Sequence, residues 1–357
     1  MNGLERYRLL LMTLDPVHVG AGGYRLGRVD MSIVREPGTN VPKIPGTSLS
    51  GVARSYAATR LGRLQCAGQK NHCGAPTCPI CYTFGSVSAQ EGQRAYRGTV
   101  SIFDAAILFF PVYSMQGPVW VTTVDRLREA GFDVGELPPQ LPEELLFTGT
   151  ADRLNLGWLM LSARHVAPPR APQGWEQSRW TEIEDRLVLV SERLFGVVVN
   201  SNLEVRTSVS IDPSTGAAES GALFTYEAIP RATFMVLDMI QHDYRHAFPS
   251  ETRLKTWQDT LSTPDSEPAR ELLAKWFPNY EKYEKTEQEK AEQDRKSAEE
   301  WVSQALGRAS SRSWQTPHDV VDAGLELAKW MGVGGMGTRG FGRLDIVSER
   351  RLGWEEA

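Results

Sequence analysis

The order of apolar and polar residues predicts that the chain opens with a strand, a loop, a second short strand and a helix. Residues 7–14 form an apolar run followed by a proline and a glycine-rich turn, which is typical of a buried central strand. Residues 29–36 alternate apolar and polar side chains with the period of a strand. Residues 49–62 place apolar side chains at helical spacing.

The rest of the pattern predicts strands interleaved with helices. Strands are predicted over residues 99–112, 119–124 and 232–240, and a hairpin over residues 203–226. Residues 240–320 are helix-rich, and opposite charges three and four positions apart at their centre are typical of a solvated helix. An amphipathic helix over residues 319–332 then leads into a closing strand. We therefore predict an α+β fold around an antiparallel sheet, with residues 240–320 as a helical insertion.

Length and composition favour one large soluble domain. The chain has 357 residues, which we interpret as a single domain, residues 1–357, that carries insertions. Hydrophobic residues at 41% and charged residues at 23% are ordinary for a folded protein. No run approaches the roughly 20 apolar residues that cross a bilayer, and the N-terminus lacks the cleavage site of a secretion signal. The sequence predicts a cytoplasmic protein with no membrane partner.

Charge is distributed unevenly. The net charge of −5 argues against a protein whose whole surface binds nucleic acid. Residues 1–60, however, carry eight basic and four acidic side chains, whereas residues 281–300 carry five basic and eight acidic ones. For nucleic-acid binding, this distribution of charge matters more than the net charge.

All four cysteines fall within sixteen residues, and we predict that they hold a metal ion. They are Cys66, Cys73, Cys78 and Cys81. Clustered thiols in a reducing compartment indicate metal rather than disulfides, and four thiolates complete a tetrahedral Zn²⁺ site. The predicted zinc is structural, in a loop insertion over residues 63–95. His72 as a substitute for one cysteine, and a redox-active pair, stay open as alternatives.

Residues 332–343 contain six glycines and two arginines between a helix and a strand. A dinucleotide fingerprint follows a strand and opens a helix, so this loop has the wrong order for it. Exposed backbone N–H groups together with arginine make a phosphate cradle, whereas the alternative interpretation is a glycine turn that ends the helix. The cradle would use Gly335, Gly337, Arg339 and Gly340.

The segment from residue 15 to residue 54 resembles the start of the RNA-binding backbone subunit of type III CRISPR effector complexes, a member of the RAMP superfamily. The matching positions are His18, Gly20, Val29, Asp30, Arg35, Ile44 to Leu49, and Arg54. Residues 102–123 and 206–234 and the glycine-rich loop resemble later phrases of the same family. Ser50 departs from the family, which usually has Lys there. Residues 109–112 are similar to the type III-B member and residues 78–86 to the zinc loop of a type III-A-like member, so the subtype stays open.

The resemblance implies an RRM-like (ferredoxin-like) domain that binds a guide RNA and, through it, a complementary target RNA. Copies of the chain would stack along the guide beside other type III effector subunits. The hairpin over residues 203–226 would be the thumb that inserts between nucleotides. Besides the glycine-rich loop, the implied RNA contacts are Arg35, Lys43, Ser48 and Arg54. A helix beginning at Thr47 or Ser48 would offer hydroxyl caps and free N–H groups to a phosphate.

The resemblance also implies chemistry at Asp30. In the family the matching aspartate is implicated in metal-dependent cleavage of target RNA, with Mg²⁺ or another divalent ion as cofactor; taken alone, an aspartate in a loop is normally a solvated turn residue. His18 and Glu227 lie in flanking motifs and would assist. As alternatives, His18 hydrogen-bonds the turn at Gly20 to Gly23, and Glu227 pairs with Arg231.

Two other functions stay open. The chain is a scaffold without activity if Asp30 does not lie against a scissile phosphate. A metal-independent endoribonuclease that processes guide precursors is the other possibility within the superfamily.

Overall fold

The computed structural model describes residues 4–22, 29–68, 72–87, 95–137, 144–309 and 314–353, without the side chains of residues 218–222. Its contacts divide the chain into two compact units, each made of separate stretches of sequence. Unit 1 comprises residues 1–6, 50–101 and 239–327, and unit 2 comprises residues 7–49, 102–238 and 328–357. The single domain that the sequence predicts stays a prediction.

A mixed sheet runs through the described residues. Its strands are β1 (Leu4–Thr13), β2 (Lys43–Ile44), β3 (Val100–Ser114), β4 (Gly117–Thr122), β5 (Glu144–Phe147), β6 (Arg153–Leu156), β7 (Leu159–His165), β8 (Leu187–Leu189), β11 (Phe234–His242) and β12 (Leu344–Leu352). Their order is β12-β1-β11-β3-β4-β8-β5-β7-β6, and β2 pairs with β3. The sheet is not purely antiparallel as predicted, because β4 pairs with β8 and β5 with β7 in parallel.

Four of these strands carry the ferredoxin-like pattern. Helix α1 (Gly46–Leu61) lies between β1 and β3 in the chain, and α9 (Pro317–Met331) lies between β11 and β12. The spatial order β12-β1-β11-β3 is therefore the order fourth, first, third, second of a β-α-β-β-α-β unit. The predicted α+β fold is confirmed.

The strand predicted over residues 29–36 is wrong. This segment makes isolated bridges instead, from Met31 to Tyr226, from Ile33 to Gly20 and from Arg35 to Pro42. The segment alternates apolar and polar residues because Ile33 is buried between more exposed neighbours. It forms no regular strand, since its bridge partners come from three separate parts of the chain.

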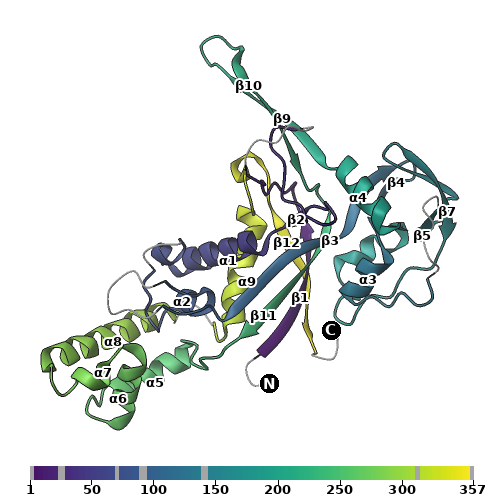
Figure 1. Cartoon of the computed structure of the whole chain (residues 1–357). Helices are drawn as coiled ribbons and strands as arrows, with labels where there is room; N and C mark the ends of the chain where they lie inside the picture. The colour runs from purple at the N-terminus through teal and green to yellow at the C-terminus, as the bar shows by residue number, and fades with distance from the viewer. Residues whose placement is uncertain are drawn as a thin grey trace. The chain divides into compact units, whose positions relative to one another are not determined.

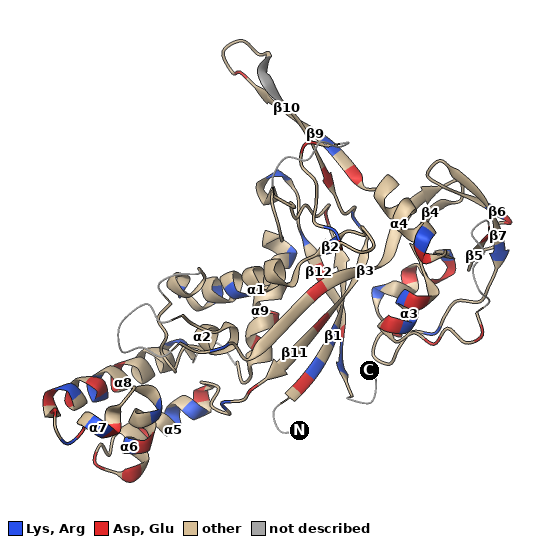
Figure 2. Cartoon of the chain, in the orientation of Figure 1, with Lys and Arg blue, Asp and Glu red and all other residues tan. Residues whose placement is uncertain are grey.

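Helices of unit 1 fill the segment predicted to be helix-rich. They are α5 (Glu251–Leu261), α6 (Glu267–Trp276), α7 (Tyr280–Tyr283) and α8 (Gln288–Ala309). Figure 2 shows basic and acidic residues interspersed along α8. The helix is not fully solvated, however, because Ala291, Ala298 and Val302 are buried in a core with Trp257 and Trp276.

Unit 2 has an aromatic core that joins β3 to the segment between residues 125 and 202, for which the sequence predicted no element. Phe109 packs edge to face against Phe132, and Trp180 lies against both rings. The local helices are α3 (Val124–Ala130), α4 (Glu192–Ser201), η2 (Arg179–Glu182) and η3 (Glu184–Arg186). No helix among the described residues is long and apolar enough to span a bilayer.

A hairpin of β9 (Glu204–Ile211) and β10 (Ala218–Ala228) forms a separate two-stranded sheet. It covers the hairpin predicted over residues 203–226, and Figure 1 shows it extending away from the other strands of unit 2. The base of this hairpin carries most of the site described next.

Candidate functional site

Asp30 is exposed at the base of the hairpin and is held by one residue of β10. The Thr225 backbone N–H and hydroxyl donate to Oδ2 of Asp30 at 2.7 and 2.9 Å. The Asp30 N–H donates back to the Thr225 hydroxyl at 3.2 Å. These bonds stabilise the charged carboxylate, the Thr225 backbone N–H most, and they lower the pKa of Asp30. Asp30 is therefore ionised near neutral pH.

An exposed apolar pair follows on the same face of the hairpin. Thr225 pairs with Thr207, and two residues further along Leu223 pairs with Val209. Because alternate side chains of a strand share a face, Leu223 and Val209 lie on the face of Thr225, about 7 Å beyond it. Leu223 is 66% exposed and Val209 44%. A charged oxygen and an apolar wedge thus face solvent side by side.

The opposite face of the hairpin packs on the glycine-rich loop. The rings of Tyr226 and Phe341 lie 5.4 Å apart, and the Arg206 guanidinium lies 4.7 Å from the centre of the Phe341 ring. The Arg339 guanidinium lies 5.9 Å from the Phe224 ring. Both arginines are exposed on the face away from Asp30, where Arg206 also pairs with Glu204 at 2.6 Å.

The glycine-rich loop is docked tightly on the turn at residue 18. The Gly335 N–H donates to the His18 carbonyl at 2.8 Å. A Cβ at Gly334, where φ is +84°, would lie 2.3 Å from the same oxygen. The short helix η4 (Gly337–Arg339) follows, and Gly337, Arg339 and Gly340 are exposed. The amide of Gly335 is thus used within the protein, whereas the next turn faces solvent.

His18 is buried below the hairpin, with 6% of its surface exposed. Its Nδ1 lies 2.7 Å from the Glu227 carbonyl oxygen, so Nδ1 carries the proton and donates it. The ring also meets Tyr226 edge to face, with 6.1 Å between the ring centres. The structure thus gives Nδ1 a partner on β10. The alternative partner, the turn at Gly20 to Gly23, ends at a residue outside the described part of the chain.

Glu227 is also buried, at 8% exposure, and its carboxylate is satisfied from inside. Oε1 accepts from the Ile33 N–H at 2.9 Å and from the Arg35 guanidinium at 2.6 Å. Arg35 is therefore the ion-pair partner, and not Arg231 as the sequence suggested. This pair joins residues 33–35 to β10. The predicted roles of His18 and Glu227 in cleavage stay predictions, as does the predicted RNA contact of Arg35.

The N-terminus of α1 is already capped by a carboxylate. The helix begins at Gly46, whose N–H donates to Oδ1 of Asp104 on β3 at 2.8 Å. Thr47 and Ser48 follow Gly46 inside this helix, so neither lies at the capping position ahead of it. The predicted hydroxyl cap is therefore wrong. The carboxylate of Asp104 on β3 accepts from the first amide of the helix, that of Gly46, instead. A phosphate at this helix end would have to compete with Asp104.

Lys43 is bound between two carboxylates. Its Nζ lies 2.6 Å from both Asp104 and Glu36. These contacts, that to Asp104 most, raise the pKa of Lys43. The Gly46 N–H and the Lys43 ammonium lower the pKa of Asp104. The lysine charge is thus largely compensated within the protein, and its RNA contact stays a prediction.

Arg54 supports the cysteine loop within unit 1. Its Nε donates to the Cys66 carbonyl at 2.7 Å, and one terminal nitrogen lies 3.4 Å from the Phe84 carbonyl. Two of its donors are therefore directed at the protein backbone. Its phosphate contact likewise stays a prediction.

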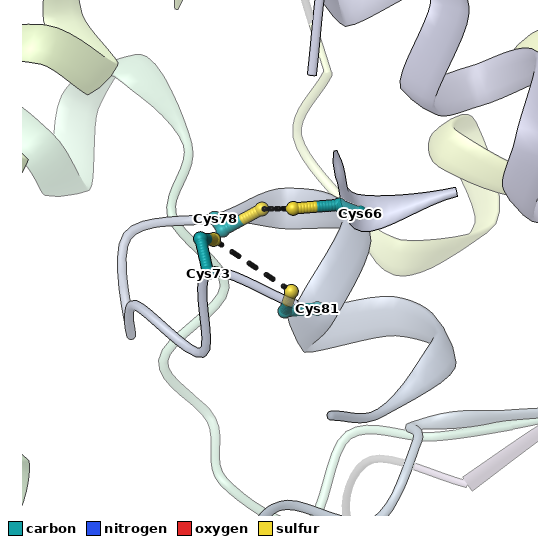
Figure 3. Close-up of side chains that lie close together, drawn as sticks. All are labelled: Cys66, Cys73, Cys78 and Cys81. Atoms are coloured by element: carbon teal, nitrogen blue, oxygen red, sulfur yellow. Dashed lines mark hydrogen bonds between the residues drawn. The ribbon is translucent and has the colours of Figure 1, made fainter. Parts of the chain in front are cut away.

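The four cysteines converge on one point, as Figure 3 shows. All four sulfurs lie within 4.8 Å of one another, with 3.8 Å between Cys73 and Cys81 and 3.9 Å between Cys66 and Cys78. A tetrahedral zinc with bonds of about 2.3 Å requires sulfurs about 3.8 Å apart. The donor set therefore fits Zn²⁺.

Two short helices bring these thiols together. Cys66 is the last residue of η1 (Leu64–Cys66). Cys78 directly precedes α2 (Pro79–Phe84), and Cys81 lies in its first turn. Hydrogen bonds from the other three thiols, that from Cys66 most, lower the pKa of the Cys73 thiol. His72 lies outside the cluster, because its two ring nitrogens hydrogen-bond the Gly68 carbonyl and the Val87 N–H.

Sequence reasoning did not find Thr225 or Asp104 as partners at these sites. Both lie in segments that matched the family, but nothing local in the sequence connects Thr225 to Asp30 or Asp104 to Gly46. Those contacts join positions 195 and 58 residues apart.

Comparison with known proteins gives a consistent family. A family model described as the RAMP superfamily matches residues 10–345. The CRISPR system Cmr endoribonuclease Cmr4 of Pyrococcus furiosus is 28% identical over 251 residues, which cover 64% of this chain and 79% of that protein. The CRISPR system Cms endoribonuclease Csm3 of Enterococcus italicus is 39% identical over 61 residues, or 16% of this chain and 28% of that protein.

Solved structures of related proteins also match. A crystal structure of Cmr4 is 19% identical and covers 96% of this chain and 99% of its own, with a TM-score of 0.46. A chain of the type III-B Cmr-beta complex in its apo state is 13% identical, with a TM-score of 0.49. The match covers 67% of this chain and 84% of that one.

Proposed function

Because the chain belongs to the RAMP superfamily, we propose that it is a guide-RNA-binding backbone subunit of a type III CRISPR effector complex and that it cleaves the complementary target RNA. The proposal is supported by relatives that are named endoribonucleases of CRISPR systems. The observation that carries it is the exposed, ionised carboxylate of Asp30 at the base of the hairpin.

Asp30 has the properties that a divalent ion and a phosphate require. Both hydrogen bonds from Thr225 go to Oδ2, so they leave Oδ1 for another ligand. Mg²⁺ is commonly bound by one or two carboxylates, waters and substrate phosphates, so one free carboxylate oxygen beside an RNA backbone fits it. When bound, the ion would neutralise charge that develops on the scissile phosphate.

The hairpin would place the RNA relative to Asp30. Leu223 and Val209 offer an apolar surface against which a displaced base can stack, on the face that carries the carboxylate. Insertion of this pair between nucleotides would turn the backbone of one nucleotide toward Asp30. Cutting would then recur once per subunit along the target, because stacked copies repeat the same hairpin.

The guide would be bound largely through its phosphates. Arg339 and the exposed turn around it are free to face an RNA backbone, and the Arg206 guanidinium lies on the same face of the hairpin. Such contacts are independent of sequence, so base pairing between guide and target would supply the specificity. Further copies of the chain and other effector subunits would complete the complex.

The cysteine cluster would hold a structural Zn²⁺. Four thiolates from Cys66, Cys73, Cys78 and Cys81 fill a tetrahedral coordination shell and leave no position for a substrate. The ion would therefore stabilise the loop between α1 and β3 and take no part in cleavage.

The decisive experiment measures cleavage of a guide-complementary RNA by the assembled complex. Wild type and Asp30→Ala are compared with Mg²⁺ and with EDTA, and Asp152→Asn, which removes an exposed carboxylate elsewhere in unit 2, is the control. We expect regularly spaced cuts from wild type and the control with Mg²⁺ only, and none from Asp30→Ala although it still binds RNA.

Two other results are informative. Unchanged cutting by Asp30→Ala would leave a scaffold without activity, and the nuclease would have to be sought in a partner subunit. Cleavage of precursor RNA by the isolated chain in EDTA would instead identify a guide-processing enzyme.

A further inference from the structure

We propose that Thr225 is a positioning residue for cleavage: its hydroxyl holds the Asp30 carboxylate in one orientation, with Oδ1 toward the RNA. This inference rests on the proposed function, because it assigns Thr225 a role through Asp30. Thr225 is not part of the sequence motif around Asp30, because it lies 195 residues away on β10.

The hydrogen bonds use the hydroxyl in both directions. It donates to Oδ2 of Asp30 at 2.9 Å and accepts from the Asp30 N–H at 3.2 Å. One side chain thereby ties the carboxylate to the backbone of the same residue, which fixes the side-chain torsion. An exposed aspartate without this link would sample several rotamers.

The two donors also decide which oxygen is left open. Oδ2 receives the Thr225 N–H at 2.7 Å as well as the hydroxyl, so two hydrogen bonds occupy it. Oδ1 receives neither of them. Within the described part of the chain, the carboxylate therefore has one oxygen held by Thr225 and one left for a ligand, as a site completed by a phosphate requires.

Thr225 is itself held rigidly. The Met31 N–H donates to its carbonyl at 3.0 Å, and the Met31 carbonyl accepts from the Glu227 N–H at 3.2 Å. These bonds join the residue after Asp30 to β10 on both sides of buried Tyr226. Threonine is β-branched, so its own torsion has few alternatives. Serine keeps the hydroxyl without this restriction, and valine keeps the shape without the hydroxyl.

The strand opposite provides a matched control. Thr207 pairs directly with Thr225 across the hairpin and is exposed on the same face. Its hydroxyl makes no described contact with Asp30. Thr207→Val therefore changes the hairpin in the same way as Thr225→Val but leaves Asp30 held.

The test compares Thr225→Val, Thr225→Ser, Thr207→Val and Asp30→Asn in the assembled complex. Loss of one hydrogen bond to a charged group predicts a cleavage rate about tenfold or more lower for Thr225→Val. Its RNA binding should be unchanged, and the Mg²⁺ concentration for half-maximal cleavage should rise. Thr225→Ser should restore most of the rate, and Thr207→Val should match wild type.

A second measurement needs neither metal nor RNA. Carbon-13 NMR of the carboxyl groups follows the titration of Asp30 in the full-length chain, with Asp30→Asn identifying its signal. Because the hydroxyl favours the charged form, the Asp30 carboxyl group should titrate at higher pH in Thr225→Val than in wild type. In Thr207→Val it should titrate as in wild type.

The outcomes separate the two proposals. If Asp30→Asn cuts normally, the proposed catalytic function fails, whatever Thr225→Val does. If Asp30→Asn is inactive while Thr225→Val cuts as fast as Thr207→Val, the role of Thr225 is refuted and that of Asp30 stands. Loss of RNA binding or an unchanged Asp30 titration in Thr225→Val would also overturn the positioning role.

Discussion

The docking of the glycine-rich loop on the turn at residue 18 predicts an unusual sensitivity at Gly334. An alanine there would have φ of +84° and a Cβ 2.3 Å from the His18 carbonyl oxygen. The left-handed conformation costs roughly 1–2 kcal/mol for a residue with a Cβ, and forcing an extra carbon into a packed contact costs roughly 1–3 kcal/mol. We therefore expect Gly334→Ala to lower the free energy of unfolding by about 2–5 kcal/mol.

The same loop offers controls for each of the two effects. Gly340 has φ of +79° but no atom within 4 Å of an added Cβ, so Gly340→Ala carries the backbone strain alone. Gly337 lacks a positive φ, and its added Cβ would lie 3.5 Å from the nearest atom, the Met331 carbonyl oxygen. Gly337→Ala should therefore be nearly neutral, and Gly340→Ala should lose roughly 1–2 kcal/mol.

Unfolding by urea, followed by tryptophan fluorescence, measures these differences as shifts in the midpoint at constant slope. The expected order of stability is Gly337→Ala, then Gly340→Ala, then Gly334→Ala. Equal losses for Gly334→Ala and Gly340→Ala would refute the reasoning, because they would mean that the loop does not approach the His18 carbonyl closely.

Two further predictions concern the metal site and the helix cap. The purified chain should contain one equivalent of zinc by elemental analysis; Cys81→Ser should lose it and melt at lower temperature, and a metal-free wild type of equal stability would contradict the site. Asp104→Asn should lower stability by about 1 kcal/mol at pH 7, because the amide caps Gly46 less well and loses Lys43. The folded state lowers the pKa of Asp104, so its contribution is present above the unfolded pKa and is lost on acidification. The difference in urea midpoints should therefore shrink below about pH 4, and a constant difference would exclude the carboxylate as its cause.

Local patterns were enough for much of the fold. The apolar runs before Pro16 and after Gly98 became β1 and β3, since a strand buried on both faces needs only a continuous apolar stretch. The cysteine cluster could also be predicted, because its donors lie within sixteen residues. Phe132 and Trp180 gave no comparable signal, because the core they share is assembled from distant, non-periodic positions.

The candidate site could be predicted only in part. The resemblance indicated Asp30, His18 and Glu227 together, and the structure leaves the first exposed and buries the other two. Burial of this kind depends on which carboxylate meets which cation. Arg35 pairs with Glu227 over 192 residues of sequence, a choice that no local spacing encodes.

The ion pair below the hairpin has a consequence for Asp30. A second free carboxylate on β10 would repel the Asp30 charge and raise its pKa, which would weaken a metal site near neutral pH. Glu227 is two residues from Thr225 on the same face, but its charge is compensated by Arg35 at 2.6 Å. The buried pair thus removes a competing charge, while Thr225 stabilises the remaining one by hydrogen bonds. Among the described residues, an ionised carboxylate thus lies beside an exposed apolar pair, which is the arrangement that the proposed cleavage site, completed by the RNA, would need.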